Sequence, residues 1–151
     1  MKLAEALNLR ADLQKRIASL KDRLIKNAKI QEGDIPAEDP SILLNELNKN
    51  IIELENFIKK INKTNSFVVI DNESISDMIA KRDALGLKLS VLRAFLTAAS
   101  NKIDRYSNKE IRILSTVNVT QKRKEIDELS KEYRILDTKL QGLNWTTDIL
   151  S

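Results

Sequence analysis

The amino-acid sequence predicts a mainly α-helical protein: four long antiparallel helices with coiled-coil-like packing, plus a minor two-stranded β element. Apolar residues recur with alternating three- and four-residue spacing over four long segments, which is typical of helices that pack as coiled coils. Only three glycines and two prolines interrupt 151 residues, so long helices can form. Because this length is typical of one domain, we expect a single helical domain over residues 1–151.

The first helix, expected over residues 3–29, carries an apolar stripe that continues into polar residues. Its apolar members are Leu13, Ile17, Leu20 and Leu24. Arg10 and Asn27 continue the same spacing, and polar residues in such a seam usually fix register or partner number. A slight roll of the helix would place Leu9 in the seam instead of Arg10, and the sequence leaves both arrangements open.

The second helix is expected over residues 40–63, after a loop that contains Gly33 and Pro36. Asp39 can cap it, and Pro40 fixes the backbone at its first position. Its stripe follows a strict heptad: Leu44, Leu47, Ile51, Leu54, Ile58 and Ile61. Leu43, Ile52 and Phe57 widen this stripe, which indicates contact with more than one neighbouring helix.

The third helix is expected over residues 75–104. Its stripe is Met78, Leu85, Leu89, Leu92, Leu96, Ala99 and Ile103, with Arg82 as the polar member. Gly86 inside a helix costs about 1 kcal/mol relative to alanine. A close helix crossing or a bend at this residue would explain why glycine stands there.

The fourth helix is expected over residues 119–141, with Asn118 as its N-cap and Gln121 as the reciprocal partner. Its stripe is Ile126, Leu129, Tyr133, Leu136 and Leu140. Gly142 is expected to end it. The following tail, residues 143–150, holds the single tryptophan and is expected to dock onto a surface that the sequence does not identify.

Two short segments, residues 66–70 and 110–117, favour β-strands because they are rich in β-branched residues, and the second alternates with period two. A third helix of about 30 residues spans about 45 Å, and the linker of about six residues after it reaches roughly 20 Å. We therefore expect the strands to pair across subunits of a homo-oligomer with closed symmetry. The alternatives are a bend at Gly86 or a self-contained four-helix bundle.

The composition excludes several classes of enzyme. Histidine and cysteine are absent, which excludes disulfides, zinc sites with nitrogen or sulfur ligands, iron–sulfur clusters and histidine-based triads. Three glycines cannot form a P-loop or a Rossmann fingerprint. We expect no catalytic activity, no cofactor and no metal. Because no apolar run is long enough for a secretion signal or a membrane span, we expect a cytoplasmic protein without membrane contact.

Charged residues offer two weak candidate sites. Glu32, Asp34, Glu38 and Asp39 in the proline loop could hold Mg²⁺ or Ca²⁺, although their spacing is not that of an EF-hand; solvated carboxylates and a helix cap are favoured. Two basic stretches, Lys59–Lys63 and Lys122–Lys124, could contact phosphates. The net charge is only +4 with both signs interleaved, and aromatic residues make up 4%, so solvated helix faces are favoured over nucleic-acid binding.

Polar residues at the expected ends of helices and strands are the candidate contacts for a partner or an anion, because loops and element ends often carry function. They are Asn62, Asn65, Arg105, Tyr106, Asn118, Asn144 and Trp145. The favoured alternative is that these side chains cap helices or dock the tail.

Seven segments together resemble a bacterial family of small uncharacterised helical proteins, some of which are labelled septicolysin. They are residues 1–7 (MKLAEAL), 27–34 (NAKIQEGD), 61–65 (INKTN), 82–85 (RDAL), 87–93 (LKLSVLR), 104–107 (DRYS) and 144–147 (NWTT). The label implies a membrane-active cytolysin, and the resemblance implies no catalytic residues. We expect a cytoplasmic oligomeric interaction or scaffold protein; a septicolysin-like cytolysin and a nucleic-acid-associated protein are the alternatives.

Overall fold

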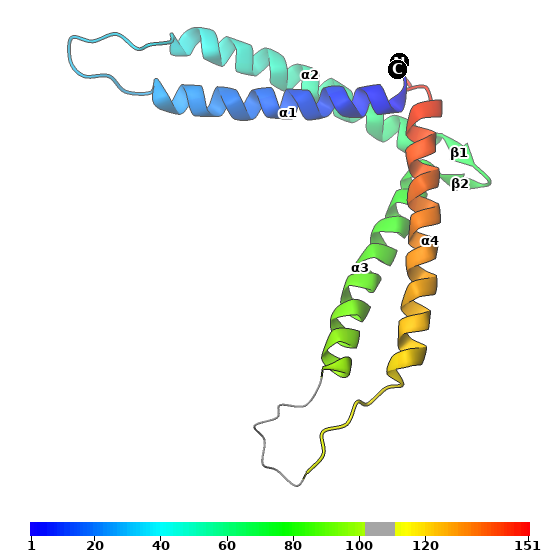
Figure 1. Cartoon of the computed structure of the whole chain (residues 1–151). Helices are drawn as coiled ribbons and strands as arrows, with labels where there is room; N and C mark the ends of the chain where they lie inside the picture. The colour runs from blue at the N-terminus through cyan, green and yellow to red at the C-terminus, as the bar shows by residue number, and fades with distance from the viewer. Residues whose placement is uncertain (102–110) are drawn as a thin grey trace. The chain divides into compact units, whose positions relative to one another are not determined.

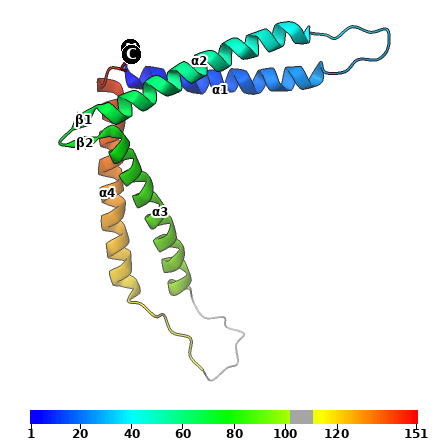
Figure 2. The ribbon, with the colours of Figure 1, turned by 180° about the vertical axis from the view of Figure 1, so that it is seen from behind.

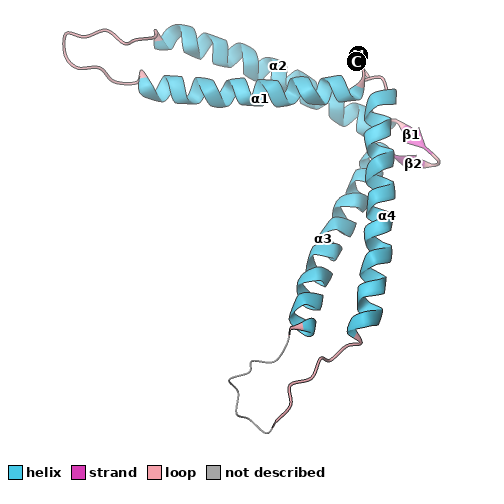
Figure 3. Ribbon diagram, in the orientation of Figure 1, coloured by secondary structure: helices cyan, strands magenta, loops and turns pink. Residues whose placement is uncertain are grey.

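The computed structural model describes residues 1–101 and 111–151 as four helices and one two-stranded antiparallel sheet (Figures 1 and 3). The elements are α1 (Leu3–Lys26), α2 (Pro40–Phe67), β1 (Val69–Ile70), β2 (Glu73–Ser74), α3 (Ile75–Ser100) and α4 (Val119–Thr146). This confirms the predicted mainly α fold with a minor β element. Compared with the predicted bounds, α1 ends earlier and α2 and α4 end later.

The chain, predicted as one domain, groups into two compact units. One unit is Met1–Ile75 together with Gly142–Ser151, and the other is Ser76–Gln141. In the first unit α1 and α2 run side by side in opposite directions (Figures 1 and 2). Arg10 is half-buried whereas Leu9 is 39% exposed, so Arg10 rather than Leu9 lies in the seam of α1.

The seam of α2 shares Leu47, Leu54 and Ile61 with the predicted heptad, but its other positions lie one residue earlier than predicted. Leu43 is 2% exposed and Leu44 is 49% exposed, and Ile51 and Ile58 are exposed as well. The buried and half-buried residues are Leu43, Leu47, Asn50, Leu54, Phe57, Ile61 and Thr64. The prediction is therefore wrong for Leu44, Ile51 and Ile58 and confirmed for Leu47, Leu54 and Ile61. Two of the true seam positions carry polar residues, so a search for apolar periodicity selects the neighbouring stripe.

The β element is a local hairpin of β1 and β2. Val69 pairs with Ser74 and Ile70 pairs with Glu73. Asp71 and Asn72 have φ angles of 52° and 66°, the left-handed conformation that a two-residue hairpin turn requires and that Asn and Asp tolerate. Of the first predicted strand, residues 66–70, only the last two form β1, because α2 continues to Phe67.

The second predicted strand, residues 110–117, is wrong over its described part. Residues 111–117 form no strand, and residue 110 lies outside the described residues. β1 pairs with β2 within the chain, and pairing of residues 66–70 with residues 110–117 across subunits stays a prediction. Period-two alternation here reflects local residue preference without a neighbouring strand to pair with.

In the second unit α3 and α4 run side by side in opposite directions (Figures 1 and 2). Met78 and Leu89 of α3 and Ile126 and Leu140 of α4 are buried, so the predicted stripes form this seam; Ile103 lies outside the described residues. A Cβ atom at Gly86 would lie 3.1 Å from Cε2 of Tyr133, so the glycine leaves room for the Tyr133 ring of α4.

Gly142 does not end α4, contrary to the prediction. The helix continues to Thr146, and the amide of Thr147 still donates to the carbonyl oxygen of Leu143 at 2.9 Å. Thr146 Oγ1 also donates to the Gly142 carbonyl oxygen at 3.1 Å. These bonds continue the helical ladder past the glycine, so its unfavourable propensity of about 1 kcal/mol is tolerated.

Candidate functional site

The outer face of α3 exposes large apolar side chains. α3 contains a second heptad, which we call the outer stripe: Ala80, Ala84, Leu87, Val91, Ala94 and Ala98. It lies opposite the seam with α4, because its positions fall half a helical turn from Leu85 and Leu89. Leu87 is 69% exposed and Val91 is 61% exposed. α3 therefore carries apolar residues on two opposite faces, and an exposed apolar face can serve as an interaction site.

Charged residues of opposite sign border the outer stripe. Asp83 precedes Leu87 by one turn and Lys88 follows it, and heptad spacing places these two residues on opposite flanks of the stripe. Asp83 Oδ1 lies 3.1 Å from Nη2 of the neighbouring Arg82. The outer stripe thus combines an apolar centre with one acidic and one basic flank.

The apolar surface continues from the end of the outer stripe onto the loop before α4. Phe95 and Ala98 of α3 line a hollow of about 280 Å³ together with Ile113 and Leu114 of this loop. Phe95 is 42% exposed, and both loop residues are more exposed still. The apolar area therefore extends beyond the helix itself.

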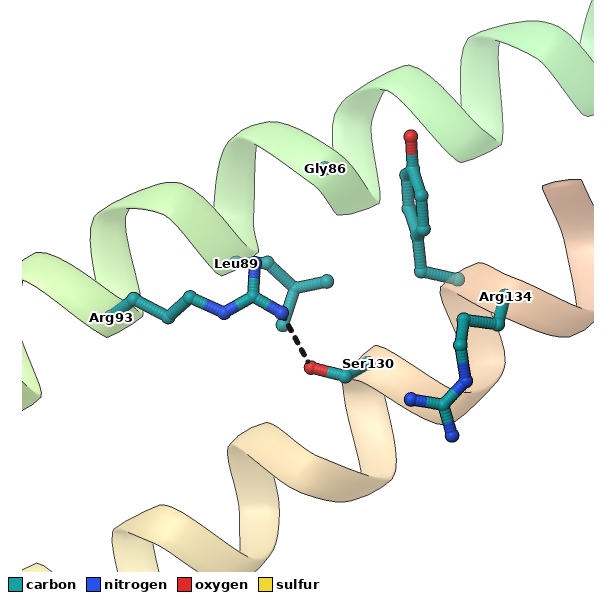
Figure 4. A pocket seen from close by; sticks show the side chains of 6 residues that line it. Gly86, Leu89, Arg93, Ser130 and Arg134 are labelled. Atoms are coloured by element: carbon teal, nitrogen blue, oxygen red, sulfur yellow. Dashed lines mark hydrogen bonds between the residues drawn. The ribbon is translucent and has the colours of Figure 1, made fainter.

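A second hollow, of about 320 Å³, lies between α3 and α4 (Figure 4). It is lined by Gly86, Leu89, Arg93, Ser130, Tyr133 and Arg134. Arg93 Nη2 donates a hydrogen bond to Ser130 Oγ at 2.8 Å. None of the six lining residues is a carboxylate, so two guanidinium groups and two hydroxyls give this hollow the chemistry that suits an oxyanion.

Arg82 is bound more tightly than the arginines of the hollow. Its Nη1 atom lies 3.1 Å from Asp137 Oδ1 on α4, and it also pairs with Asp83. Partial burial acts to lower the pKa of Arg82, but its hydrogen bonds to Asp83 and Asp137 outweigh this effect and raise the pKa. Arg82, the one polar member of the predicted α3 stripe, therefore forms an ion pair with Asp137 that links α3 to α4.

The first unit holds a clasp between residues 1–3 and residues 147–151. The amide of Leu3 donates to the Thr147 carbonyl oxygen at 2.8 Å, and the amide of Ile149 donates to the Met1 carbonyl oxygen at 3.0 Å. Thr64, which is fully buried, accepts a hydrogen bond from the Leu150 amide at 2.9 Å. The tail therefore docks, as predicted, although its tryptophan, Trp145, is 60% exposed.

Replacing Thr64 with valine is expected to destabilise the clasp. The Thr64 hydroxyl donates to the Lys60 carbonyl oxygen at 2.7 Å and accepts from Leu150, so valine leaves the partly buried Leu150 amide without its acceptor. The expected loss is about 1–3 kcal/mol of unfolding free energy, measured by urea denaturation. Thr64→Ser keeps the hydroxyl and is the matched control; an equal loss in both variants would contradict this role.

The ion pair of the clasp is expected to give a pH-dependent contribution to stability. The hydrogen bond from Lys2 lowers the pKa of Asp148 below its ordinary value of 3.8, and the Lys2 charge adds to this. A carboxylate whose pKa is lower in the folded state than in the unfolded state stabilises the fold at pH values above its unfolded-state pKa. This stabilisation is lost as the pH falls through the folded-state pKa. The difference in unfolding free energy between the unaltered chain and Asp148→Asn should shrink below pH 3.8. A pH-independent difference would contradict this.

Asn118 performs the capping role foreseen for it. Its Oδ1 atom accepts a hydrogen bond from the Gln121 amide at 3.1 Å, at the start of α4. Asn118→Ala is therefore expected to lower the unfolding free energy by about 1 kcal/mol. Asn118→Asp keeps a side-chain acceptor and should retain most of the stabilisation that the cap provides. Thermal denaturation followed by circular dichroism measures the stability of both variants. An Asn118→Ala variant as stable as the unaltered chain would show that the cap contributes nothing.

The other predicted contact residues within the described part of the chain lie near the ends of α2 and α4. Asn62 is exposed and Asn65 half-buried near the end of α2, and Oδ1 of Asn65 is buried without a hydrogen-bond partner among the described residues. Asn144 and Trp145 lie in the last turn of α4, in the same unit. Arg105 and Tyr106 lie outside the described residues.

Two of the four loop carboxylates have structural roles. Glu38 Oε2 accepts a hydrogen bond from Arg23 Nε at 3.0 Å, and this bond lowers the pKa of Glu38 against the opposing effect of burial. Asp39 caps α2 by accepting from the Ser41 amide at 2.9 Å. Within residues 1–101 and 111–151, no group of three acidic side chains comes together as metal ligands would.

The structure singles out residues that the sequence patterns did not. The outer stripe of α3 and the residues of the α3–α4 hollow were both missed. A search for a second heptad that counts alanine as apolar would have found the outer stripe. No comparable signal exists for the hollow, because Arg93 and Ser130 come from distant parts of the sequence. No helix in the described part of the chain combines the length and apolarity needed to cross a membrane.

Comparison with known proteins places the chain in a family without assigning its activity. The sequence pattern of DUF6847, a family of unknown function, matches residues 10–149. A crystal structure of a functionally unknown conserved protein from Corynebacterium diphtheriae is similar, with 37% sequence identity, a TM-score of 0.91 and 99% of each chain covered. No curated protein matches significantly. The chain belongs to the DUF6847 family of proteins of unknown function.

Proposed function

We propose that the protein is a homo-oligomeric interaction or scaffold protein of the cytoplasm, without catalytic activity, whose subunits join through the outer stripe of α3. The observation that carries this proposal is the exposure of Leu87 and Val91 on a helix whose opposite face is already buried. Removing one such side chain from water stabilises an association by about 1.5–3 kcal/mol.

The distribution of charge supports this choice of surface. α4 carries its charged residues outward along most of its length, for example Lys131, Glu132 and Lys139, all of which are exposed. In contrast, no member of the outer stripe of α3 is charged. A surface that excludes charge at its centre and keeps it at the edges resembles the core and rim of a protein interface. The absence of cysteine suits a reducing cytoplasm.

Co-purification of two versions of the chain tests the proposal. An affinity-tagged copy and an untagged copy are expressed together, and the tagged copy is captured and washed. We expect the untagged copy to be retained. Capture of the tagged copy alone would overturn self-association, provided that the eluted protein has the circular dichroism spectrum of a folded helical protein.

The two alternative functions are separated in the same preparation. The septicolysin label predicts release of dye from liposomes at micromolar protein, whereas a scaffold should leave the vesicles intact. A nucleic-acid-associated protein would bind labelled DNA with an affinity that falls steeply as salt rises. We expect neither result, and either one obtained with a protein that fails to co-purify with itself would replace the scaffold proposal.

A further inference from the structure

We infer that α3 pairs in parallel, and in register, with α3 of a second copy of this chain. This inference rests on the proposed function, since it names the partner and the orientation at the same surface. Written as a heptad, the outer stripe places Ala84, Val91 and Ala98 at a positions and Ala80, Leu87 and Ala94 at d positions. A β-branched residue at a with leucine at d favours parallel two-stranded coiled coils.

The flanking charges favour the parallel orientation. In a parallel pair, the g position of one helix lies beside the e position five residues later on its partner, and such pairs set partner choice and orientation. Asp83 occupies g and Lys88 occupies e. A parallel dimer therefore contains two symmetry-related pairs of Asp83 with Lys88 of the second copy. A two-fold axis also gives a closed assembly of two chains.

The antiparallel orientation lacks this complementarity. It would place Leu87 against Val91 of the second copy, and the two Lys88 side chains would then face each other across the two-fold axis. Like charges on neighbouring helices are unfavourable. The antiparallel arrangement also leaves Asp83 without a cation on the second copy, because the residue facing it there is Thr97.

Alanine at the outer layers allows the two backbones to approach closely. Ala80, Ala84, Ala94 and Ala98 bracket the larger Leu87 and Val91, so the bulky layers lie at the middle of the pairing. Phe95, at an e position beside this core, is 42% exposed and would cover the edge of the Val91 layer. The surface thus has a packed centre and a charged rim.

Disulfide trapping tests the orientation, and the chain is well suited to it because it contains no cysteine. A disulfide needs Cα atoms about 4.4–6.8 Å apart. In the parallel register, Ala84 faces Ala84 of the second copy, so Ala84→Cys should form a covalent dimer under mild oxidation. In the antiparallel register, Ala84 faces Ala94, so only a mixture of Ala84→Cys and Ala94→Cys would cross-link through unlike residues. Thr138→Cys, exposed on α4, is the control that should remain a single chain.

A charge exchange tests the same orientation without oxidation. Asp83→Lys should weaken dimerisation at least tenfold, and the double variant Asp83→Lys with Lys88→Asp should restore most of it. The restoration cannot arise within one helix, because residues five apart do not face each other there. Failure of the double variant to recover would overturn the parallel register.

The outcomes separate this inference from the proposed function. A protein that co-purifies with itself but cross-links only in the mixture of Ala84→Cys and Ala94→Cys overturns the parallel orientation and leaves self-association intact. If the protein co-purifies with itself but no combination of cysteine variants cross-links, its subunits join through another surface, and the inference is overturned. One that neither co-purifies nor cross-links overturns both.

Discussion

Replacing Leu87 with lysine is expected to convert the oligomer into single chains of 17.2 kDa, measured by light scattering after size-exclusion chromatography. Leu87 is 69% exposed, so the change should leave the helical hairpin folded. In the assembly, however, the two ammonium groups would have to be buried in the central layer. Burying an unpaired charge is far more costly than the apolar contact it replaces, so association should weaken by orders of magnitude.

Ile135→Lys is the matched control for this experiment. Ile135 is 61% exposed on α4, within the same unit as Leu87 but outside the outer stripe. It should leave both the solution mass and the helical content unchanged. If Ile135→Lys dissociates the protein as effectively as Leu87→Lys, the joint does not lie on the outer stripe of α3.

Replacing Leu43 with alanine is expected to lower the unfolding free energy by about 2–5 kcal/mol. Leu43 is only 2% exposed, and the smaller alanine side chain leaves a cavity in its place. Leu44 is the adjacent residue, has the same side chain and is 49% exposed. Leu44→Ala should therefore cost much less, about 1 kcal/mol or below. The comparison isolates burial, since chemistry and helix position are matched.

Urea denaturation followed by the helical circular dichroism signal measures both variants. The midpoint should fall strongly for Leu43→Ala and slightly for Leu44→Ala, with little change in the slope of free energy against urea. The opposite order would mean that the strict heptad through Leu44, and not the seam through Leu43, faces α1. Equal losses would mean that both stripes are packed in the folded protein.

This pair of leucines also shows how far apolar periodicity predicts the fold. The stripes of α1, α3 and α4 are predicted correctly because their seam positions are nearly all apolar. In α2 the seam includes Asn50 and Thr64, which are 9% and 0% exposed. Thr64 satisfies its hydroxyl within the helix and with the tail, a long-range contact that no local pattern contains.

The β element illustrates a different limit of local patterns. Residues 111–117 have the alternation of a strand, but a strand forms only where a second backbone supplies hydrogen bonds. The real partner of β1 is Glu73–Ser74, two residues with little β preference. Their pairing depends on the left-handed backbone of Asp71 and Asn72, and the sequence shows this turn without showing which segment follows it into the sheet.

The surface proposed for self-association was partly accessible from the sequence. Narrow seams and polar seam residues predict an oligomer, but of the segments expected to join its subunits only β1 forms a strand, and it pairs with β2 within the chain. The outer stripe escaped notice because four of its six members are alanine, which is as common on exposed helix faces as in buried ones. Only the exposure of Leu87 and Val91 opposite a completed seam identifies this face.

Sedimentation equilibrium of the unaltered chain at micromolar concentrations tests self-association through α3 most directly, because it gives a mass that does not depend on molecular shape. A parallel pair of α3 helices requires twice the chain mass of 17.2 kDa, with a return toward the single-chain mass in Leu87→Lys. A mass of 17.2 kDa at every concentration would contradict it.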